Sequence, residues 1–301
     1  MPRSRFVRDV GLTFRMTTVM FLLGALLVVL VVTLMYLFSS IWFIIGLGGI
    51  AFAFFQWWRS DTVAMRAMRA YEVTPEEYPE LHGTIDRLCA MAEMPKPRVG
   101  ISELEIPNAF ATGRSPDRAV VCVTTGIMGK LTTEELEGVL AHELSHVAHR
   151  DVLVMTVASS AGILAGMATR GAQFGALSRR GNDSGGAPAY LVVIAVSLLV
   201  YAVSFFLLRL LSRYRELCAD RAGAYLTMKP AALASALQKI TGEMAAIPQK
   251  DLRASKAMNA FFIAPAISGA TLKTLTSTHP SLEQRLEQLA KIQAELGRTE
   301  P

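Results

Sequence analysis

Four long uncharged runs stand out along the sequence, separated by stretches in which polar and apolar residues alternate. The first run has 23 residues, and a helix of that length extends about 34 Å, enough to cross the hydrocarbon core of a bilayer. Only Ser39 and Ser40 separate it from the second run, so the pair predicts a transmembrane helical hairpin. The four runs are Met16–Phe38, Ile41–Trp58, Val152–Thr169 and Ala189–Leu208.

A cleaved signal peptide is the alternative interpretation of the first run. The run is too long for the apolar part of a signal peptide, no small-x-small cleavage site follows it, and a second apolar run comes at once. Basic residues precede the first run and follow the second, and the turn between them has none, so both flanks are expected in the cytoplasm. The basic residues are Arg3, Arg5, Arg8, Arg15, Arg59, Arg66 and Arg69.

The third and fourth runs predict a second hairpin with less regular features. Gly162 and Gly166 form a small-xxx-small pair suited to close helix packing. The Gly-rich loop 170–188 carries arginines that argue against its translocation, whereas arginines outside the hairpin favour it. Two further spans and a shallow hairpin packed within protein therefore both remain open. The loop arginines are Arg170, Arg179 and Arg180, and the opposing ones are Arg150, Arg209, Arg213 and Arg215.

Composition agrees with a membrane protein. The 301 residues are 52% hydrophobic and 18% charged, with a mean hydropathy of +0.37, which is too apolar for an ordinary soluble protein. The net charge of +5 lies largely beside the apolar runs, and no nucleic-acid motif accompanies it, so we expect a lipid bilayer and no nucleic acid as partner. The three cysteines form no disulfide framework and give no sign of an oxidising compartment.

The polar stretches predict a domain with helices and a few strands. Leu81, Ile85, Leu88 and Met91 recur at helical spacing. The stretches "PRVGISELEIPNAFATG" and "RAVVCVTTGIM" have strand character, with turn residues between them. Farther on, Thr132 with Glu135 fits a capping box, which starts a helix that contains "HELSH".

The "HELSH" motif indicates a catalytic zinc site. His142 and His146 are four residues apart, so they lie on one face of a helix and can offer two imidazoles to one Zn²⁺. Glu143 beside them is placed to accept a proton from a metal-bound water. The alternative is a helix with two surface histidines, and it is weakened because Leu140, Leu144 and Val147 would pack on another side of that helix.

A third zinc ligand must come from elsewhere in the chain. His149 continues the same helical stripe and cannot wrap around the same ion, and it is not the Gly that a metzincin motif requires there. His82 lies on an earlier helix and is expected to be an exposed or capping residue. Glu216 and Asp220 are again four apart, so one could ligate zinc while the other supports a histidine, or both could be solvated acids.

The sequence resembles the HtpX-type membrane zinc endopeptidases, relatives of the prenyl-protein (CaaX) peptidases. The resemblance covers nearly the whole chain: two N-terminal runs, "PNAFATG", "HELSH" with Asp151, a hydrophobic hairpin, the Glu-x-x-x-Asp helix and "STHPSLEQRL". It implies an α+β, predominantly helical membrane protein with a gluzincin-like zinc protease domain that contains a small sheet, plus two transmembrane hairpins. The expected parts are a hairpin with a basic tail at 1–58, the protease halves at 59–151 and 209–301, and a second hairpin at 152–208.

The resemblance also implies roles for particular residues. Glu216 would be the third ligand of one zinc ion per chain, with Asp220 supporting a ligating histidine. Asn108 would lie on an edge strand beside the substrate and polarise the scissile carbonyl, where its alternative is a turn asparagine. His279 would stabilise the oxyanion and Arg285 would brace the site, where the alternatives are a helix-entry histidine and a solvated arginine.

The function implied is hydrolysis of membrane or unfolded polypeptides at the cytoplasmic face of the cell membrane, as part of membrane-protein quality control. One alternative is a prenyl-peptide processing enzyme, which would need an enclosed chamber that four spans seldom provide. Another is a non-catalytic zinc-binding membrane scaffold. Glu143, the expected general base, is present, and this favours an enzyme.

Overall fold

The computed structural model describes residues 10–37, 57–151, 187–246 and 279–299, with scattered positions between 47 and 55 and between 165 and 173. Most of the second and third uncharged runs lies outside the described residues, so the two predicted hairpins remain predictions. The chain divides into two compact units. Unit 1 comprises Met1–Leu12, Ser60–Leu153 and Ser212–Pro301, and unit 2 comprises Thr13–Arg59 and Val154–Leu211.

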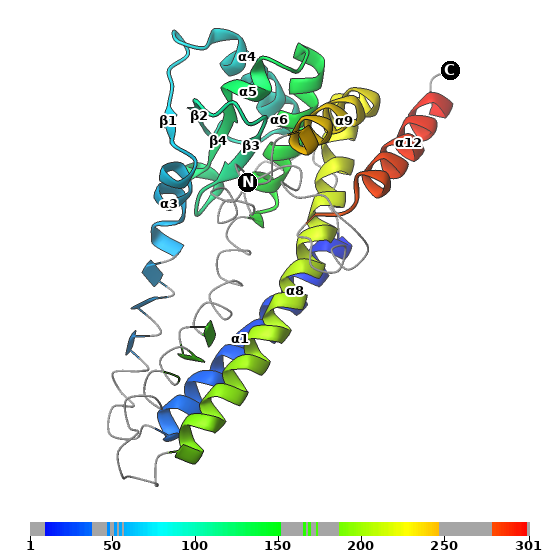
Figure 1. The fold of residues 1–301 in the computed structure, drawn as a ribbon. Coiled ribbons are helices and arrows are strands. Elements are labelled where there is room, and N and C mark those ends of the chain that lie inside the picture. The colour runs from blue at the N-terminus through cyan, green and yellow to red at the C-terminus, as the bar shows by residue number, and fades with distance from the viewer. Residues whose placement is uncertain are drawn as a thin grey trace. The chain divides into compact units, whose positions relative to one another are not determined.

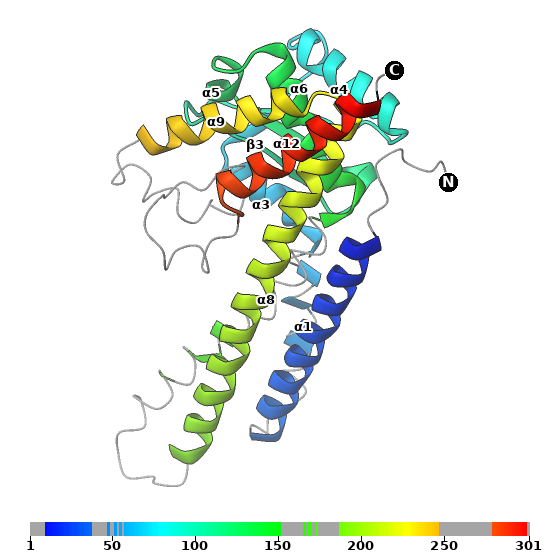
Figure 2. The same ribbon diagram turned by 90° about the vertical axis from the view of Figure 1, so that its right-hand side faces the viewer.

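Unit 2 contains most of helix α1 (Val10–Leu37) and the first part of helix α8 (Ala187–Thr227). Both helices are long and apolar enough to cross a membrane, with candidate spans of 27 and 37 residues. They are the two long helices of Figure 1 and Figure 2. Leu30 of α1 and Val200 of α8 are buried in one cluster with Ala165, while Phe21 and Leu199 are largely exposed. Exposed apolar faces of this kind suit contact with lipid tails.

Unit 1 is built on a mixed four-stranded sheet with strand order β1-β2-β4-β3. The strands β2 and β4 are parallel, while β1 pairs antiparallel with β2 and β3 pairs antiparallel with β4. Strand β3 therefore forms one edge of the sheet. The strands are β1 (Ala70–Glu72), β2 (Arg98–Ser102), β3 (Ala109–Thr112) and β4 (Val120–Thr124). The small sheet and the mainly helical composition confirm the α+β expectation.

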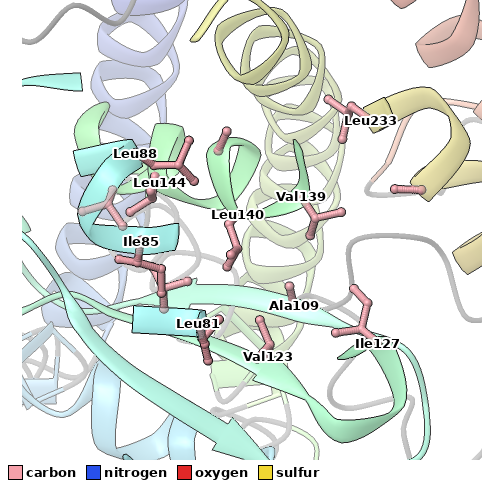
Figure 3. Close-up of a cluster of buried hydrophobic side chains, with 14 of the residues drawn as sticks. Leu81, Ile85, Leu88, Ala109, Val123, Ile127, Val139, Leu140, Leu144 and Leu233 are labelled. Carbon is pink, nitrogen blue, oxygen red and sulfur yellow. The ribbon is translucent and has the colours of Figure 1, made fainter. Parts of the chain in front are cut away.

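The remaining elements of unit 1 are helical. They are α3 (Ser60–Ala67), α4 (Pro79–Ala92), the 3-10 turn η2 (Pro116–Arg118), α5 (Thr125–Met128), α6 (Thr133–Ala148), α9 (Pro230–Ala246) and α12 (Leu282–Thr299). Figure 3 shows side chains from α4, α6 and the sheet meeting in one core. The predicted helix periodicity holds at Leu81, Ile85 and Leu88, but Met91 is 37% exposed and Ala92 takes the buried place. A step of four residues from Leu88, in place of the assumed step of three, keeps the buried stripe on one side of the helix.

Helix α6 starts and packs as its sequence predicts. The Thr132 hydroxyl accepts a hydrogen bond from the Glu135 N–H at 3.3 Å, and the Glu135 carboxylate accepts one from the Thr132 N–H at 2.8 Å. This reciprocal pair is a capping box. Leu140 and Leu144 are completely buried toward α4 and the sheet (Figure 3). The helix is therefore held firmly, which gives fixed positions to the polar side chains on its other faces.

A glycine allows α8 to approach α6 closely. At Gly223 of α8, a Cβ atom would lie 3.0 Å from the backbone nitrogen of His142 and 3.3 Å from the carbonyl carbon of Ala141. Both neighbours are backbone atoms of α6, which cannot move aside as a flexible side chain would. The absence of a side chain at residue 223 thus sets the spacing of the two helices.

We expect Gly223→Val to force α8 away from α6 and to destabilise the protein by about 1–3 kcal/mol, as overpacking of a tight contact does. The midpoint of thermal unfolding in detergent measures this. Gly83→Val is the matched control, because Gly83 is an exposed helical glycine with no atom within 4 Å of a new Cβ. Its midpoint should stay the same or rise. An equal loss in both variants would contradict the importance of the close approach.

Candidate metal centre

Two helices of unit 1 bring three potential metal ligands together. Helix α6 carries His142 and His146, and the part of α8 that belongs to unit 1 carries Glu216. One ligand atom from each of these residues lies within 4.8 Å of the other two. The Nε2 atoms of the histidines are each 3.5 Å from a different Glu216 oxygen, His142 from Oε2 and His146 from Oε1.

The geometry of this group fits a tetrahedral metal. Ligand atoms at 2.0–2.1 Å from a tetrahedral zinc lie about 3.3 Å from one another. The two separations of 3.5 Å are close to this value, and 3.5 Å is long for an ordinary hydrogen bond. His142 Nε2 is buried and has no hydrogen-bond partner among the described residues. A buried nitrogen left without a partner is costly, and a metal ion at this point would satisfy it.

The site is buried throughout. The exposed fractions are 0% for His142, 4% for Glu143, 7% for His146 and 5% for Glu216. The alternative of a helix with two surface histidines is therefore wrong, and so is that of two solvated acids at Glu216 and Asp220, since Asp220 is 0% exposed. Metal bound here would be held in a region of low dielectric constant, where its charge acts strongly.

His142 is held from behind by an aspartate and an arginine. Its Nδ1 lies 2.9 Å from Asp220 Oδ1, and both Asp220 oxygens accept hydrogen bonds from Arg285, at 2.7 and 2.6 Å. Arg285 is only 2% exposed, so the alternative of a solvated arginine is wrong. Burial lowers the pKa of His142, but the carboxylates of Asp220 and Glu216 beside its two ring nitrogens outweigh it and raise the pKa to about 9. A metal ion binds the neutral imidazole, so protons compete with metal at this residue.

His146 has a corresponding pair of neighbours, to which the sequence alone assigned no role at the metal site. Its Nδ1 lies 2.7 Å from Asp151 Oδ2, and the same oxygen is 3.0 Å from Arg215 Nε. Burial raises the pKa of Asp151, but the charge of Arg215 and the hydrogen bond with His146 lower it overall. Arg215, counted above among the arginines outside the second hairpin, is 8% exposed and ion-paired with Asp151. The usable sequence signals were its position next to Glu216 and the short step from His146 to Asp151.

Glu143 lies against the edge strand of the sheet. Burial raises the pKa of Glu143, while charges on His142 and His146 and a hydrogen bond from the Ala111 backbone oppose the shift. Ala111 is in β3, the edge strand of the sheet, which pairs only with β4. A carboxylate with a raised pKa binds a proton more readily than a free one, which suits a group that accepts a proton and then returns it.

Two other predicted residues have different surroundings. His279 is 7% exposed, and its Nδ1 lies 3.2 Å from Glu216 Oε2, so the structure brings it to the site. Asn108 immediately precedes β3 and is completely buried. Its backbone N–H donates to Thr124 Oγ1 and its carbonyl accepts from the Thr124 N–H, both at 2.9 Å. The sheet thus fixes the position of Asn108.

The two remaining histidines lie outside the ligand group. His82 is 6% exposed, and its Nε2 is 3.1 Å from the carbonyl oxygen of Val73. The expectation of an exposed or capping role for His82 was wrong, because this side chain of α4 points inward, toward the backbone of Val73. His149 follows α6, and its Nδ1 is 2.8 Å from the Ser145 carbonyl oxygen.

Comparison with known proteins identifies the family to which the chain belongs. Residues 75–293 match the model for peptidase family M48. Protease HtpX homolog 1 of Streptomyces coelicolor is 55% identical over 296 residues, which cover 98% of this chain and 97% of that relative. Protease HtpX homolog 2 of Methanosarcina acetivorans is 48% identical over 297 residues, which cover 98% of this chain and 100% of that relative.

A solved structure shares the fold. Ste24p of S. mikatae aligns with a TM-score of 0.53 at 18% identity, covering 93% of this chain and 67% of that protein. With a family model that spans most of the chain and relatives matched over nearly their full length, the chain belongs to peptidase family M48. Within that family it is a membrane metalloprotease of the HtpX type.

We expect Glu216→Gln to lose most of its bound metal, because two imidazoles alone hold a divalent ion weakly. Asp220→Asn should bind metal about 10–100-fold more weakly than the parent, as changes behind a ligating histidine do. Metal content per purified chain and competition with a chelator measure both effects. An empty site in Asp220→Asn together with a filled site in Glu216→Gln would reverse the two roles.

Proposed function

We propose that the chain cleaves peptide bonds with one Zn²⁺ ion held by His142, His146 and Glu216. The observation that carries this proposal is the convergence of their ligand atoms within 4.8 Å in a buried site. Two histidines from one helix and a glutamate from another constitute a gluzincin-like arrangement. The bound zinc would supply a Lewis acid that polarises the scissile carbonyl and lowers the pKa of a water molecule.

Glu143 is the general base of the proposed reaction. It accepts the proton of the attacking water and later returns it to the leaving amine, a task that suits its buried position and raised pKa. It follows His142 directly on α6, so it points beside the ligand histidines and toward the edge strand. The Ala111 N–H that it contacts ties the base to the strand beside which a substrate would lie.

The remaining residues act on the substrate or on the ligands. His279 has one ring nitrogen near Glu216, and its other nitrogen is the group proposed to stabilise the oxyanion. Asn108, placed at the start of the edge strand, is proposed to hold the substrate and polarise the scissile carbonyl. Arg285 braces the site through Asp220, which neutralises a buried carboxylate and fixes its orientation.

The proposed location is the cytoplasmic face of the cell membrane, in a multi-pass arrangement with two transmembrane hairpins. Two helices are apolar and long enough to span, and basic residues flank the first predicted hairpin on both sides. A protease anchored in this way meets membrane-bound chains at high effective concentration. We therefore propose that its substrates are membrane or unfolded polypeptides and that it serves membrane-protein quality control.

The test of the reaction uses the purified protein and a quenched fluorescent peptide. The parent should cleave it, a chelator should stop cleavage, and Zn²⁺ should restore it. Glu143→Gln should lower kcat by at least about 10²-fold, as loss of a general base does, while its zinc content stays at one per chain. His279→Ala should lower kcat with zinc content unchanged. A parent that binds zinc and cleaves no peptide, or a zinc-free Glu143→Gln protein, would contradict the assignment.

The cytoplasmic location can be tested with one engineered cysteine. Cys89, Cys122 and Cys218 are all buried, so an exposed cysteine elsewhere reports alone. Lys291 on α12 is 69% exposed and belongs to the unit that carries the site. Lys291→Cys should react with a membrane-impermeant maleimide in inverted vesicles and stay unlabelled in intact cells. Labelling in intact cells would place the site on the outer face.

A further inference from the structure

The two ligating histidines are supported by separate and similar sets of buried residues. Behind His142 stand Asp220 and Arg285. Behind His146 stand Asp151, at 2.7 Å from Nδ1, and Arg215, at 3.0 Å from the same aspartate oxygen. Both sets place the carboxylate on Nδ1 and leave Nε2 directed toward Glu216.

We propose that Asp151 and Arg215 are positioning residues that hold His146 as a zinc ligand. A neutral imidazole that binds metal through Nε2 carries its proton on Nδ1, and Asp151 is placed to accept that proton in a hydrogen bond. The bond fixes both the tautomer and the tilt of the ring. The inference rests on the proposed zinc site and adds two residues to it.

Arg215 acts through Asp151. Asp151 is 1% exposed, and a carboxylate so deeply buried needs a compensating charge. Arg215 provides this charge from α8, with its Nε 3.0 Å from Asp151 Oδ2. Its guanidinium also lies 3.5 Å from His146 Nδ1. The arginine thus holds the aspartate charged and oriented, and the aspartate orients the histidine.

Arg215 is adjacent in the chain to the proposed third ligand. Arg215 and Glu216 are consecutive on α8, and successive helical residues point about 100° apart. One turn of α8 therefore supplies both the third ligand and the group that anchors the second histidine. Asp151 lies three residues after the end of α6 and directly precedes the third uncharged run. Correct placement of α8 against α6 thus completes two parts of the site at once.

The experiment measures zinc affinity in an otherwise inactive Glu143→Gln protein, by competition with chelators of graded strength. Asp151→Ala should weaken zinc binding by about 10–100-fold and Asp151→Asn by less. The visible spectrum of the Co²⁺-loaded protein should also change in Asp151→Ala, because the ring of His146 loses its fixed tilt. Asp151→Asn preserves shape and supplies the measurement if Asp151→Ala fails to fold.

Glu135→Gln is the matched control. Glu135 is another buried carboxylate associated with α6, paired with Lys239 at 2.7 Å and away from the ligands. Its substitution should lower the thermal midpoint and leave zinc affinity and the Co²⁺ spectrum unchanged. If Glu135→Gln weakens zinc binding as much as Asp151→Ala does, a general loss of stability explains both and the proposal is wrong.

A double-mutant comparison tests the order of action. Arg215→Gln alone should weaken zinc binding, but in the Asp151→Asn background it should add little, since the arginine acts through the aspartate. Additive effects would contradict that order. Unchanged affinity and spectrum in both Asp151 variants would overturn the role of Asp151 while the zinc site stands. A parent protein that binds no zinc would instead overturn the proposed function.

Discussion

The structure of the site depends on a balance of buried charge. Four carboxylates lie in or beside it, each at most 5% exposed, and two arginines lie among them, each at most 8% exposed. Taking a charge out of water costs several kcal/mol. Four acids can therefore be buried together only if positive charges lie beside them. Two guanidinium groups and one divalent metal ion would cancel the four negative charges. The acids are Glu143, Asp151, Glu216 and Asp220, and the arginines are Arg215 and Arg285.

This balance explains why the site needs elements far apart in the sequence. Helix α6 supplies the two histidines and Glu143, whereas the two buried arginines come from later segments, Arg215 from α8 and Arg285 from α12. The close approach at Gly223 allows α8 to reach α6. The buried acids at the site therefore depend on the packing of these elements against one another.

Local features of this fold could be predicted from the sequence. The capping box at Thr132 and Glu135 and the pair His142 and His146 depend on residues a few positions apart, and the geometry of one helix fixes how they meet. The buried stripe of α4 was predicted only in part, since a periodicity with steps of three and four does not decide between Met91 and Ala92.

Long-range features could not be derived from residue patterns alone. Glu216 was assigned as a ligand through a family resemblance, because nothing local separates a metal ligand from a solvated acid. Arg215 illustrates the same limit: beside an apolar run it resembles a membrane-flanking charge, yet it is buried against Asp151. Partners that lie more than 60 residues away in the chain decide its role.

We propose that a glutamate of α8 completes a metal site begun by two histidines of α6. X-ray absorption spectroscopy of zinc-loaded Glu216→Cys tests it most directly, because a sulfur ligand scatters differently from an oxygen. A new Zn–S distance of about 2.3 Å is expected beside two Zn–N distances of about 2.0–2.1 Å. A fully occupied zinc site with an unchanged shell of nitrogen and oxygen ligands would contradict it.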